Sequence, residues 1–221
     1  MKKILAWYFS EESRRLRYGD NRPIVLGKEH IVWGTPEPCK RGLHGSINLL
    51  DALEYAPGSI VWRVELSGRI KKGDDKIAAT RRRYIAGGID VYGVLREFAR
   101  KQALSVAHLW DMPAIVREYL ETGDESKRAE AISAVSAIES PKSATKSAIS
   151  AISATRSTVS AILSATWVAV LAAESAERAE TELKAKPAAW LDARAVAWSA
   201  ANEMLTNMVE LAIKQGGKAN E

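Results

Sequence analysis

The sequence predicts an α+β protein: a small N-terminal sheet domain, then helices, then a long helical arm rich in Ala and Ser. Three observations carry this prediction. Residues 1–88 hold apolar and aromatic runs punctuated by glycine, which is typical of short strands. Residues 89–125 change to a helical spacing of apolar side chains. From residue 126 to the end, 25 Ala and 13 Ser stand among 96 residues, which marks a domain boundary by composition.

The first segment, 1–88, is expected to form a basic α+β ligand-binding domain. Apolar, aromatic and β-branched runs predict strands at residues 4–9, within 24–33, at 59–66 and at 77–85. Ser46 is expected to cap a helix that runs to Tyr55 and stops at Pro57. Gly68 and Gly73 are expected in turns.

The second segment, 89–125, is expected to be a helical connector. Apolar spacing predicts one helix over 91–108. A second helix is expected around residues 115–120, opened by Asp111 and Pro113. Gly123 is expected to close this helix, and Asp124 can cap the next one.

The third segment, 126–221, repeats every seven residues. One column of the repeat holds Ile138, Thr145, Ile152, Val159 and Thr166. The column four residues on holds Lys142, Ile149, Arg156, Leu163 and Val170. These are the two seam positions of a heptad, so a long helix is expected over 142–184, with a second helix after Pro187. The seam needs a partner, either this second helix folding back or another copy, and we expect a homo-oligomer.

Charge and composition narrow the class of partner. The chain has a net charge of +5, and residues 1–88 carry 17 Lys and Arg against 10 Asp and Glu. Residues 126–221 carry 11 against 10, so an anionic partner is expected at the N-terminal segment. The total is modest for a non-specific binder, and long nucleic acid is therefore not expected. No run of 18 apolar residues exists, and the N-terminal apolar run is too short for a signal peptide, so we expect no membrane partner and a cytoplasmic location.

The segment Cys39–Ser46 is the first candidate site. It joins a proline-rich loop to the expected helix, so its backbone amides and the helix dipole would favour an anion. Arg41 adds a cation, while His44 and Ser46 offer polar contacts. A tight turn with His44 in the core is the alternative. Cys39 and His44 could also form a nucleophile and base, although no third group that would orient them is identifiable.

Basic and aromatic residues form the second candidate set. Alternation along the strand at 77–85 places Arg81 and Arg83 on one face and Arg82 on the other. Arginine forks suit phosphate, and aromatic rings can stack on a base. We therefore expect ligand contacts from Arg41, His44, Ser46, Arg63, Lys72, Lys76, Arg81, Arg83, Trp33 and Tyr84. The alternative is a solvated strand face with acidic partners, and aromatic residues that pack in the core.

Several catalytic signatures are absent from the sequence. It has no phosphate-binding GxxxxGKS loop, no GxGxxG after a strand, no HExxH and no GxSxG. Its three histidines lack metal-ligand spacing, and its single cysteine excludes an internal disulfide and a thiolate zinc site. We expect no cofactor, no metal and no catalytic residues.

The chain resembles a group of small proteins common in bacteriophage and prophage genomes. The resemblance rests on Gly42–Ser46 (GLHGS), Asp51–Gly58 (DALEYAPG), Arg63–Gly68 (RVELSG) and Gly73–Lys76 (GDDK), and further on Leu109–Pro113 (LWDMP) and Glu121–Asp124 (ETGD). It covers residues 1–125 and implies a phage origin without bringing established catalytic residues. Separately, His44-Gly45-Ser46 is similar to the motif that holds nicotinamide in poly-ADP-ribose polymerase-like transferases.

These features together predict a phage counter-defence protein that binds and sequesters a small anionic nucleotide signal without turnover. Cyclic nucleotides and ADP-ribose derivatives are the expected ligand class. An ADP-ribosyltransferase-like enzyme is the first alternative, with His44 and Ser46 on NAD and Glu65 polarising the ribose. A structural or adaptor protein that assembles through its helical arm is the second alternative.

Overall fold

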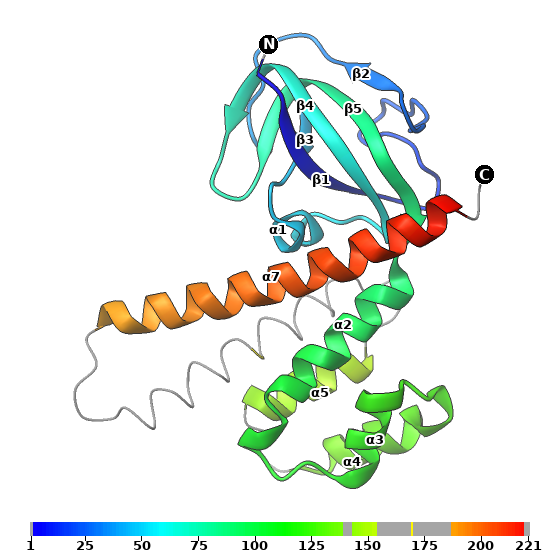
Figure 1. Ribbon diagram of the computed structural model, residues 1–221, viewed down its shortest axis with the longest axis vertical. Helices are drawn as coiled ribbons and strands as arrows, with labels where there is room; N and C mark the ends of the chain where they lie inside the picture. Colours follow the sequence, from blue (N-terminus) through cyan, green and yellow to red (C-terminus); the bar gives the residue numbers. More distant parts are fainter. Residues whose placement is uncertain (1, 139–142, 154–168, 170–186, 219–221) are drawn as a thin grey trace. The chain divides into compact units, whose positions relative to one another are not determined.

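The computed structural model describes residues 2–138, 143–153, 169 and 187–218 (Figure 1). The chain is α+β as predicted, with an antiparallel five-stranded sheet followed by helices. It divides into two compact units. The sheet unit comprises the residues up to Tyr92 together with those from Thr206 onward, and the helical unit comprises Gly93–Leu205. The sequence assigned all of 126–221 to one arm, whereas the residues from Thr206 onward group with the sheet.

The sheet is built around its longest strand. Its members are β1 (Ile4–Ser10), β2 (Glu29–Ile31), β3 (Leu43–Gly45), β4 (Ile60–Lys72) and β5 (Ile77–Asp90). The order is β1-β4-β5-β2, and β3 also pairs with β5. Residues 77–79 of β5 pair with β3 and residues 81–83 pair with β2, so one strand supports two short ones end to end (Figure 1).

The sheet curls until its first and third strands meet. Trp7 of β1 donates its backbone N–H to the Ser46 carbonyl at 2.7 Å, and the Ser46 N–H donates back at 3.0 Å. This pair links the end of β3 to β1 and gives the sheet a barrel-like form, called the barrel below. Its interior holds the main apolar cluster, which includes Ala6, Trp62, Val64, Leu66 and Tyr84.

Two local expectations about this region are wrong. The short helix α1 (Leu49–Glu54) has Asn48 at its N-cap position, so Ser46 lies two residues too early to cap it; the Ser46 backbone pairs with Trp7 instead. Gly68 does not end a strand: it lies inside β4 at φ +80°, within a bulge opposite β5. The turn at Gly73 is confirmed, since its N–H donates to the Lys76 carbonyl at 2.8 Å between β4 and β5.

The helices follow the sheet in the order that the sequence predicts. They are α2 (Tyr92–Ser105), a 3₁₀ turn (Ala107–Leu109), α3 (Ala114–Thr122), a second 3₁₀ turn (Glu125–Lys127), α4 (Arg128–Ser136), α5 (Ser143–Ser153) and α7 (Pro187–Lys218). Gly123 ends α3 in the left-handed region at φ 71°, and the Asp124 carboxylate accepts from the Ser126 N–H at 2.9 Å. Both caps are therefore confirmed.

The heptad columns can be followed only in part. Thr145 and Ile152 of the first column are buried, and the Ile152 carbonyl accepts from Arg128 Nε of α4 at 2.9 Å. Val159 and most of the expected long helix lie outside the described residues. Within the part of the chain that the structure describes, no helix combines the length and apolarity needed to cross a membrane.

Candidate anion-binding cleft

A buried arginine on β5 is the focus of the candidate site. Arg82 is 2 % exposed, although it carries a full charge. Its register partner on β4 is Leu66, whose side chain lies in the barrel core, so Arg82 points into the barrel and not toward solvent. Burial of an unpaired charge is costly, so the surroundings of this guanidinium decide what the site can do.

The protein surrounds Arg82 with neutral groups. Its Nε and Nη2 donate to the Tyr84 hydroxyl at 3.0 and 2.8 Å, and its Nη1 donates to the His44 carbonyl at 2.6 Å. The Tyr8 ring lies against the guanidinium, with Cζ 3.7 Å from the ring centroid. Among the described residues, no carboxylate contacts Arg82.

Arg82 lines a cleft of about 670 Å³. Residues of β1, β3 and α1 and of the loops on either side of β2 bound this cleft. The lining residues used below are Tyr8, Tyr18, Asp20, Cys39, Lys40, Arg41, His44, Ser46, Tyr55, Lys76 and Arg82. A cleft of this size suits a small molecule.

Positive charge dominates the lining. Two of the cations form salt bridges: Lys40 Nζ lies 2.8 Å from Glu37 Oε1, and Arg17 Nε lies 3.5 Å from Glu11 Oε1. Arg41, Lys76 and Arg82 have no carboxylate partner among the described residues. The one carboxylate in the lining, Asp20, is held by Arg22 at 2.6 and 2.7 Å, which lowers its pKa. The cleft therefore favours an anion.

Lys76 lies at the rim beside an aromatic side chain. Its Nζ is 3.3 Å from the centroid of the Tyr55 ring, and the Tyr55 hydroxyl donates to Asp75. This hydrogen bond raises the pKa of Tyr55, so the phenol stays protonated. Lys76 is also within hydrogen-bonding reach of the Cys39 thiol.

A second buried layer lies behind Arg82. His30 of β2 is 1 % exposed, and its Nδ1 is 3.2 Å from the Tyr84 hydroxyl. The His30 and Tyr84 rings meet edge to face with centroids 5.4 Å apart. Burial, then the positive charges of Arg22 and Arg82, lower the pKa of His30 to about 4. His30 is therefore neutral near pH 7, and it fixes the hydroxyl that positions Arg82.

Four of the ten residues expected at the site line the cleft, and a fifth lies behind it. Arg41, His44, Ser46 and Lys76 line the cleft. Tyr84 stands one layer deeper, where its hydroxyl accepts from Arg82. Tyr84 therefore positions Arg82 from behind but does not itself line the cleft.

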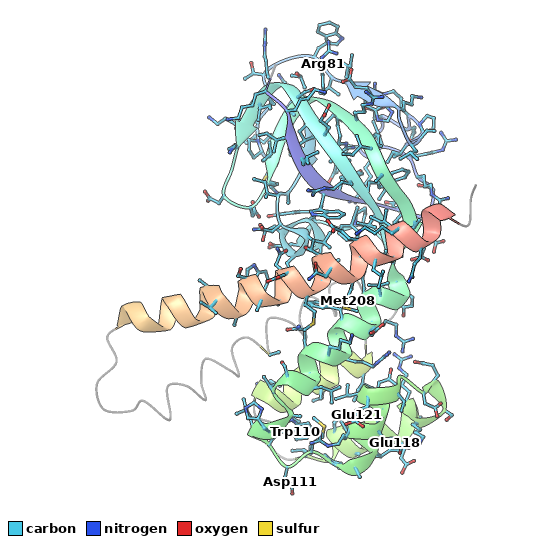
Figure 2. All side chains as sticks on the ribbon, viewed as in Figure 1. Arg81, Trp110, Asp111, Glu118, Glu121 and Met208 are labelled. Carbon is cyan, nitrogen blue, oxygen red and sulfur yellow. The ribbon has the colours of Figure 1, made fainter. Side chains whose placement is uncertain are left out.

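The other expected residues lie elsewhere. Arg81, labelled in Figure 2, forms a salt bridge with Glu29 of β2, in which Nη1 lies 2.9 Å from Oε2. Arg83 is exposed. Both have the strand parity opposite to Arg82 and so lie on the outer face. Lys72 is exposed at the end of β4, and Trp33 is 91 % exposed; neither lines the cleft.

Arg63 also lies on the outer face of the sheet. Its Cζ is 4.4 Å from the centroid of the Trp7 ring, and its buried Nη1 has no hydrogen-bond partner. Burial lowers the pKa of Arg63, and the nearby Glu210 of α7 opposes this shift. Arg63 therefore packs against β1 and faces α7, not the cleft.

The geometry also bears on the chemistry considered for Cys39–Ser46. The expected helix N-terminus at this segment is wrong, because Leu43–Gly45 form β3 and α1 begins only at Leu49; anion binding by the segment stays a prediction. Cys39 and His44 both line the cleft, but the described residues add no carboxylate that would orient the imidazole. Glu65 faces outward from β4, pairs with Lys3 at 2.9 Å and does not line the cleft.

Sequence reasoning missed the central residues of this site. Arg82 and Tyr8 line the cleft and His30 lies behind Arg82, yet none of the three was among the expected contacts. The signal was present for Arg82, because Arg82 and Tyr84 share strand parity and a buried tyrosine marks the inner face. Within the described residues, no three His, Cys, Asp or Glu side chains gather as metal ligands would.

Residues 25–97 match a family model described as a domain of unknown function, DUF7666. That span runs from just before β2 into α2, and it contains His44, Lys76 and Arg82. No curated protein and no solved structure matches the chain.

Proposed function

We propose that the barrel binds a small anionic nucleotide in this cleft and holds it without turnover. The observation that carries the proposal is Arg82, a buried cation at the cleft that no described carboxylate neutralises. The neutral acceptors around Arg82 and the Tyr8 ring offset only part of the cost of burying this charge. An anion that enters the cleft would supply the missing charge and so gain a strong, desolvated interaction.

Aromatic side chains favour a nucleotide over a simple anion. Tyr18 stands at the cleft and is 95 % exposed, and Tyr55 is half exposed beside Lys76. Exposed tyrosines next to cations suit a nucleobase, which stacks on a ring while its phosphate meets the charge. The volume of about 670 Å³ accommodates a ligand of that size.

The residues of the cleft favour binding over catalysis. The lining offers hydrogen-bond donors, and its one carboxylate is engaged by Arg22. Glu65, which an ADP-ribosyltransferase-like reaction would use, faces away. The sequence resemblance implies a phage origin. In the phage counter-defence role proposed here, a stoichiometric binder in the host cytoplasm removes a nucleotide signal, such as a cyclic nucleotide or an ADP-ribose derivative.

Calorimetry on matched arginine variants tests the proposal. The full chain is titrated with cyclic mono- and dinucleotides, cyclic ADP-ribose isomers, ADP-ribose and 5′-nucleotides. We expect micromolar or tighter binding of at least one, and a loss of at least about tenfold in Arg82→Lys, since lysine cannot reproduce a fork of donors. Arg81→Lys and Arg83→Lys, on the outer face of the same strand, should bind within about twofold of the parent. No binding by any nucleotide would overturn the proposal.

The single cysteine gives an independent readout. Cys39 is exposed and lines the cleft, so a bound ligand should shield its thiol. We expect saturating nucleotide to slow the reaction of Cys39 with a disulfide reagent several-fold. Arg82→Lys at the same nucleotide concentration should react at the unliganded rate. An unchanged rate in the parent protein, at a concentration where calorimetry reports saturation, would place the ligand outside this cleft.

A further inference from the structure

A second cavity borders the cleft and shares two of its residues. This cavity has a volume of about 480 Å³, and its lining consists of Thr35, Pro36, Glu37, Lys40, Arg41 and Lys71. Lys40 and Arg41 also line the cleft that contains Arg82. Both belong to a tight turn, in which the Glu37 N–H donates to the Arg41 carbonyl at 2.8 Å and the Arg41 N–H donates to the Glu37 carbonyl at 2.9 Å. This turn therefore contributes side chains to both cavities.

Positive charge exceeds negative charge in the second cavity. Glu37, the one carboxylate in its lining, forms a salt bridge with Lys40, in which Nζ lies 2.8 Å from Oε1. The side chains of Arg41 and Lys71 form no hydrogen bond or ion pair with the described residues. The second cavity thus holds two cations without a carboxylate partner, and it attracts an anion in addition to the one that Arg82 would bind.

Arg41 has a defined position near Arg82. Gly34 has φ +100°, and a Cβ there would lie 3.3 Å from Arg41 Nη1, so the guanidinium lies close against this glycine. Three residues after Arg41, the His44 carbonyl accepts from Arg82 Nη1 at 2.6 Å. Three residues of extended chain span at most about 11 Å. A single ligand of dinucleotide size can therefore reach both arginines.

We propose that the ligand carries phosphate groups on two separate riboses, and that the second phosphate binds Arg41 and Lys71 in the second cavity while the first binds Arg82. This inference rests on the proposed function and names the ligand class of the same cleft. A mononucleotide has its phosphate at one point and would leave one group of cations without a partner. The two phosphates of a pyrophosphate share a bridging oxygen, so they are too close together to divide between the cavities.

The aromatic residues of the cleft agree with a ligand that has two bases. Tyr18 and Tyr55 both line the cleft and are exposed. They come from different parts of the chain, since Tyr18 precedes β2 and Tyr55 follows α1. Each ring can stack on one base. A dinucleotide would therefore use both tyrosines together with both groups of cations.

Calorimetry with ligands that differ by one phosphate tests the inference. For adenine and for guanine, the full chain is titrated with the 5′-phosphorylated linear dinucleotide, the cyclic dinucleotide, the linear dinucleotide without its 5′-phosphate, and the 5′-mononucleotide. ADP-ribose is the probe for a pyrophosphate. We expect at least one ligand with two phosphates to bind at least about tenfold more tightly than the dinucleotide with one phosphate. The stoichiometry should be one ligand per protomer.

Lys71 and Lys72 provide a matched pair of variants. They are neighbouring exposed residues of β4, but Lys71 lines the second cavity whereas Lys72 lines neither cavity. Lys71→Gln should weaken binding of the two-phosphate ligand at least about threefold and leave the one-phosphate dinucleotide unchanged. Lys72→Gln removes the same charge and should bind both ligands as the parent protein does. Both side chains are exposed, so neither substitution removes a buried contact, and the thermal midpoint checks the fold of each variant.

The possible results separate this inference from the proposed function. Equal affinity for the dinucleotides with one and two phosphates would overturn the second phosphate site and leave the proposed function intact. A 5′-mononucleotide or ADP-ribose that binds as tightly as every two-phosphate ligand would overturn it too. An equal loss in Lys71→Gln and Lys72→Gln would show an effect of general surface charge and would also contradict the inference. Failure of every ligand here and in the wider nucleotide panel would overturn the proposed function itself.

Discussion

Two buried basic side chains, Arg82 and His30, meet at the hydroxyl of Tyr84. Arg82 keeps its charge and uses the hydroxyl as an acceptor. His30 gives up its charge instead, because burial and the cations around it hold its pKa at about 4. One phenol oxygen therefore separates a permanent cation from a neutral imidazole, and this arrangement makes the stability of the barrel sensitive to acid.

Acid should destabilise the protein through His30. An unfolded histidine has a pKa of about 6.5, so between pH 6.5 and 4 the unfolded state binds more protons than the folded state. The stability due to neutral His30 is complete above pH 6.5 and is lost as the pH falls to about 4, by about 3 kcal/mol in all. His30→Asn keeps a side-chain amide near Tyr84 and removes the titration.

Urea unfolding at several pH values measures this effect. The difference in unfolding free energy between the parent protein and His30→Asn should shrink as the pH falls from 7.5 to 4. The carboxylates and His44 are present in both proteins. Their contribution to the pH dependence therefore cancels in the difference between the two unfolding free energies. A difference that stays constant over this range would show that His30 is not the group responsible.

At the scale of the elements, β5 shows what the sequence could and could not predict. Alternation separated Arg82 from Arg81 and Arg83, and the register confirms that separation. The sequence did not show which arginine faces the interior, because three consecutive arginines give no contrast in polarity. Ile85 made the assignment harder, since this apolar residue lies on the outer face and is 42 % exposed. Tyr84 was the better guide, being fully buried on the inner face.

Other elements were predictable in proportion to their local signals. Strands β1 and β5 and the caps around Gly123 were predicted because apolar runs and capping residues act over a few positions. Strand β3 was not, because three residues containing a histidine and a glycine form a strand only through pairing with β5. The barrel closure at Ser46 was missed for the same reason: its partner, Trp7, is distant in the chain.

Strand β5 has a bulge near Gly87, because Val61 pairs with Ile89 whereas the next residue of β4, Trp62, pairs with Gly87. This bulge depends on glycine. Gly87 has φ +91°, and a Cβ there would lie 2.5 Å from the Val61 carbonyl oxygen of β4. Gly87→Ala should therefore lower the unfolding free energy by about 2 kcal/mol or more, from backbone strain and the clash together. Gly93→Ala in α2 is the matched control, because no atom lies within 4 Å of its added methyl group.

Chemical denaturation compares the two glycine variants. Gly93→Ala should be neutral or stabilising by up to about 1 kcal/mol, since alanine favours helix. If both alanine variants unfold at the same denaturant concentration, the bulge does not require a left-handed residue, and the described register of β4 on β5 is wrong at this point.

At the scale of the whole molecule, the helical arm remains the element expected to drive assembly. In the described part, however, Ile152 packs within its own chain, where its carbonyl accepts from Arg128 of α4. Helix α7 begins in the helical unit and ends in the sheet unit. A substitution in the seam can therefore act on folding as well as on oligomerisation, and the two effects must be measured separately.

Ile152→Asp separates these effects when both stability and mass are recorded. A buried, unpaired carboxylate should lower the unfolding free energy by several kcal/mol. Ile132→Asp on α4, where the parent side chain is 38 % exposed, should cost less than about 1 kcal/mol. Light scattering on the full chain should give a mass above one protomer. A variant Ile152→Asp that unfolds like the parent but loses that mass would show instead that Ile152 lies between chains.

The closure of the barrel between Trp7 and Ser46 and the pairing of β1 with β4 make the folding of β1 depend on strands that are synthesised later. Strand β1 leaves the ribosome first, yet Ile4 pairs with Leu66, and β4 in turn needs β5, which ends at Asp90. The aromatic residues of β1 therefore stay unpaired and accessible to chaperones until β4 and β5 have left the ribosome. Such distant pairings slow folding and make it cooperative. A nascent chain cut short before β5 would hold neither a closed barrel nor Arg82, so ligand could protect only the finished product.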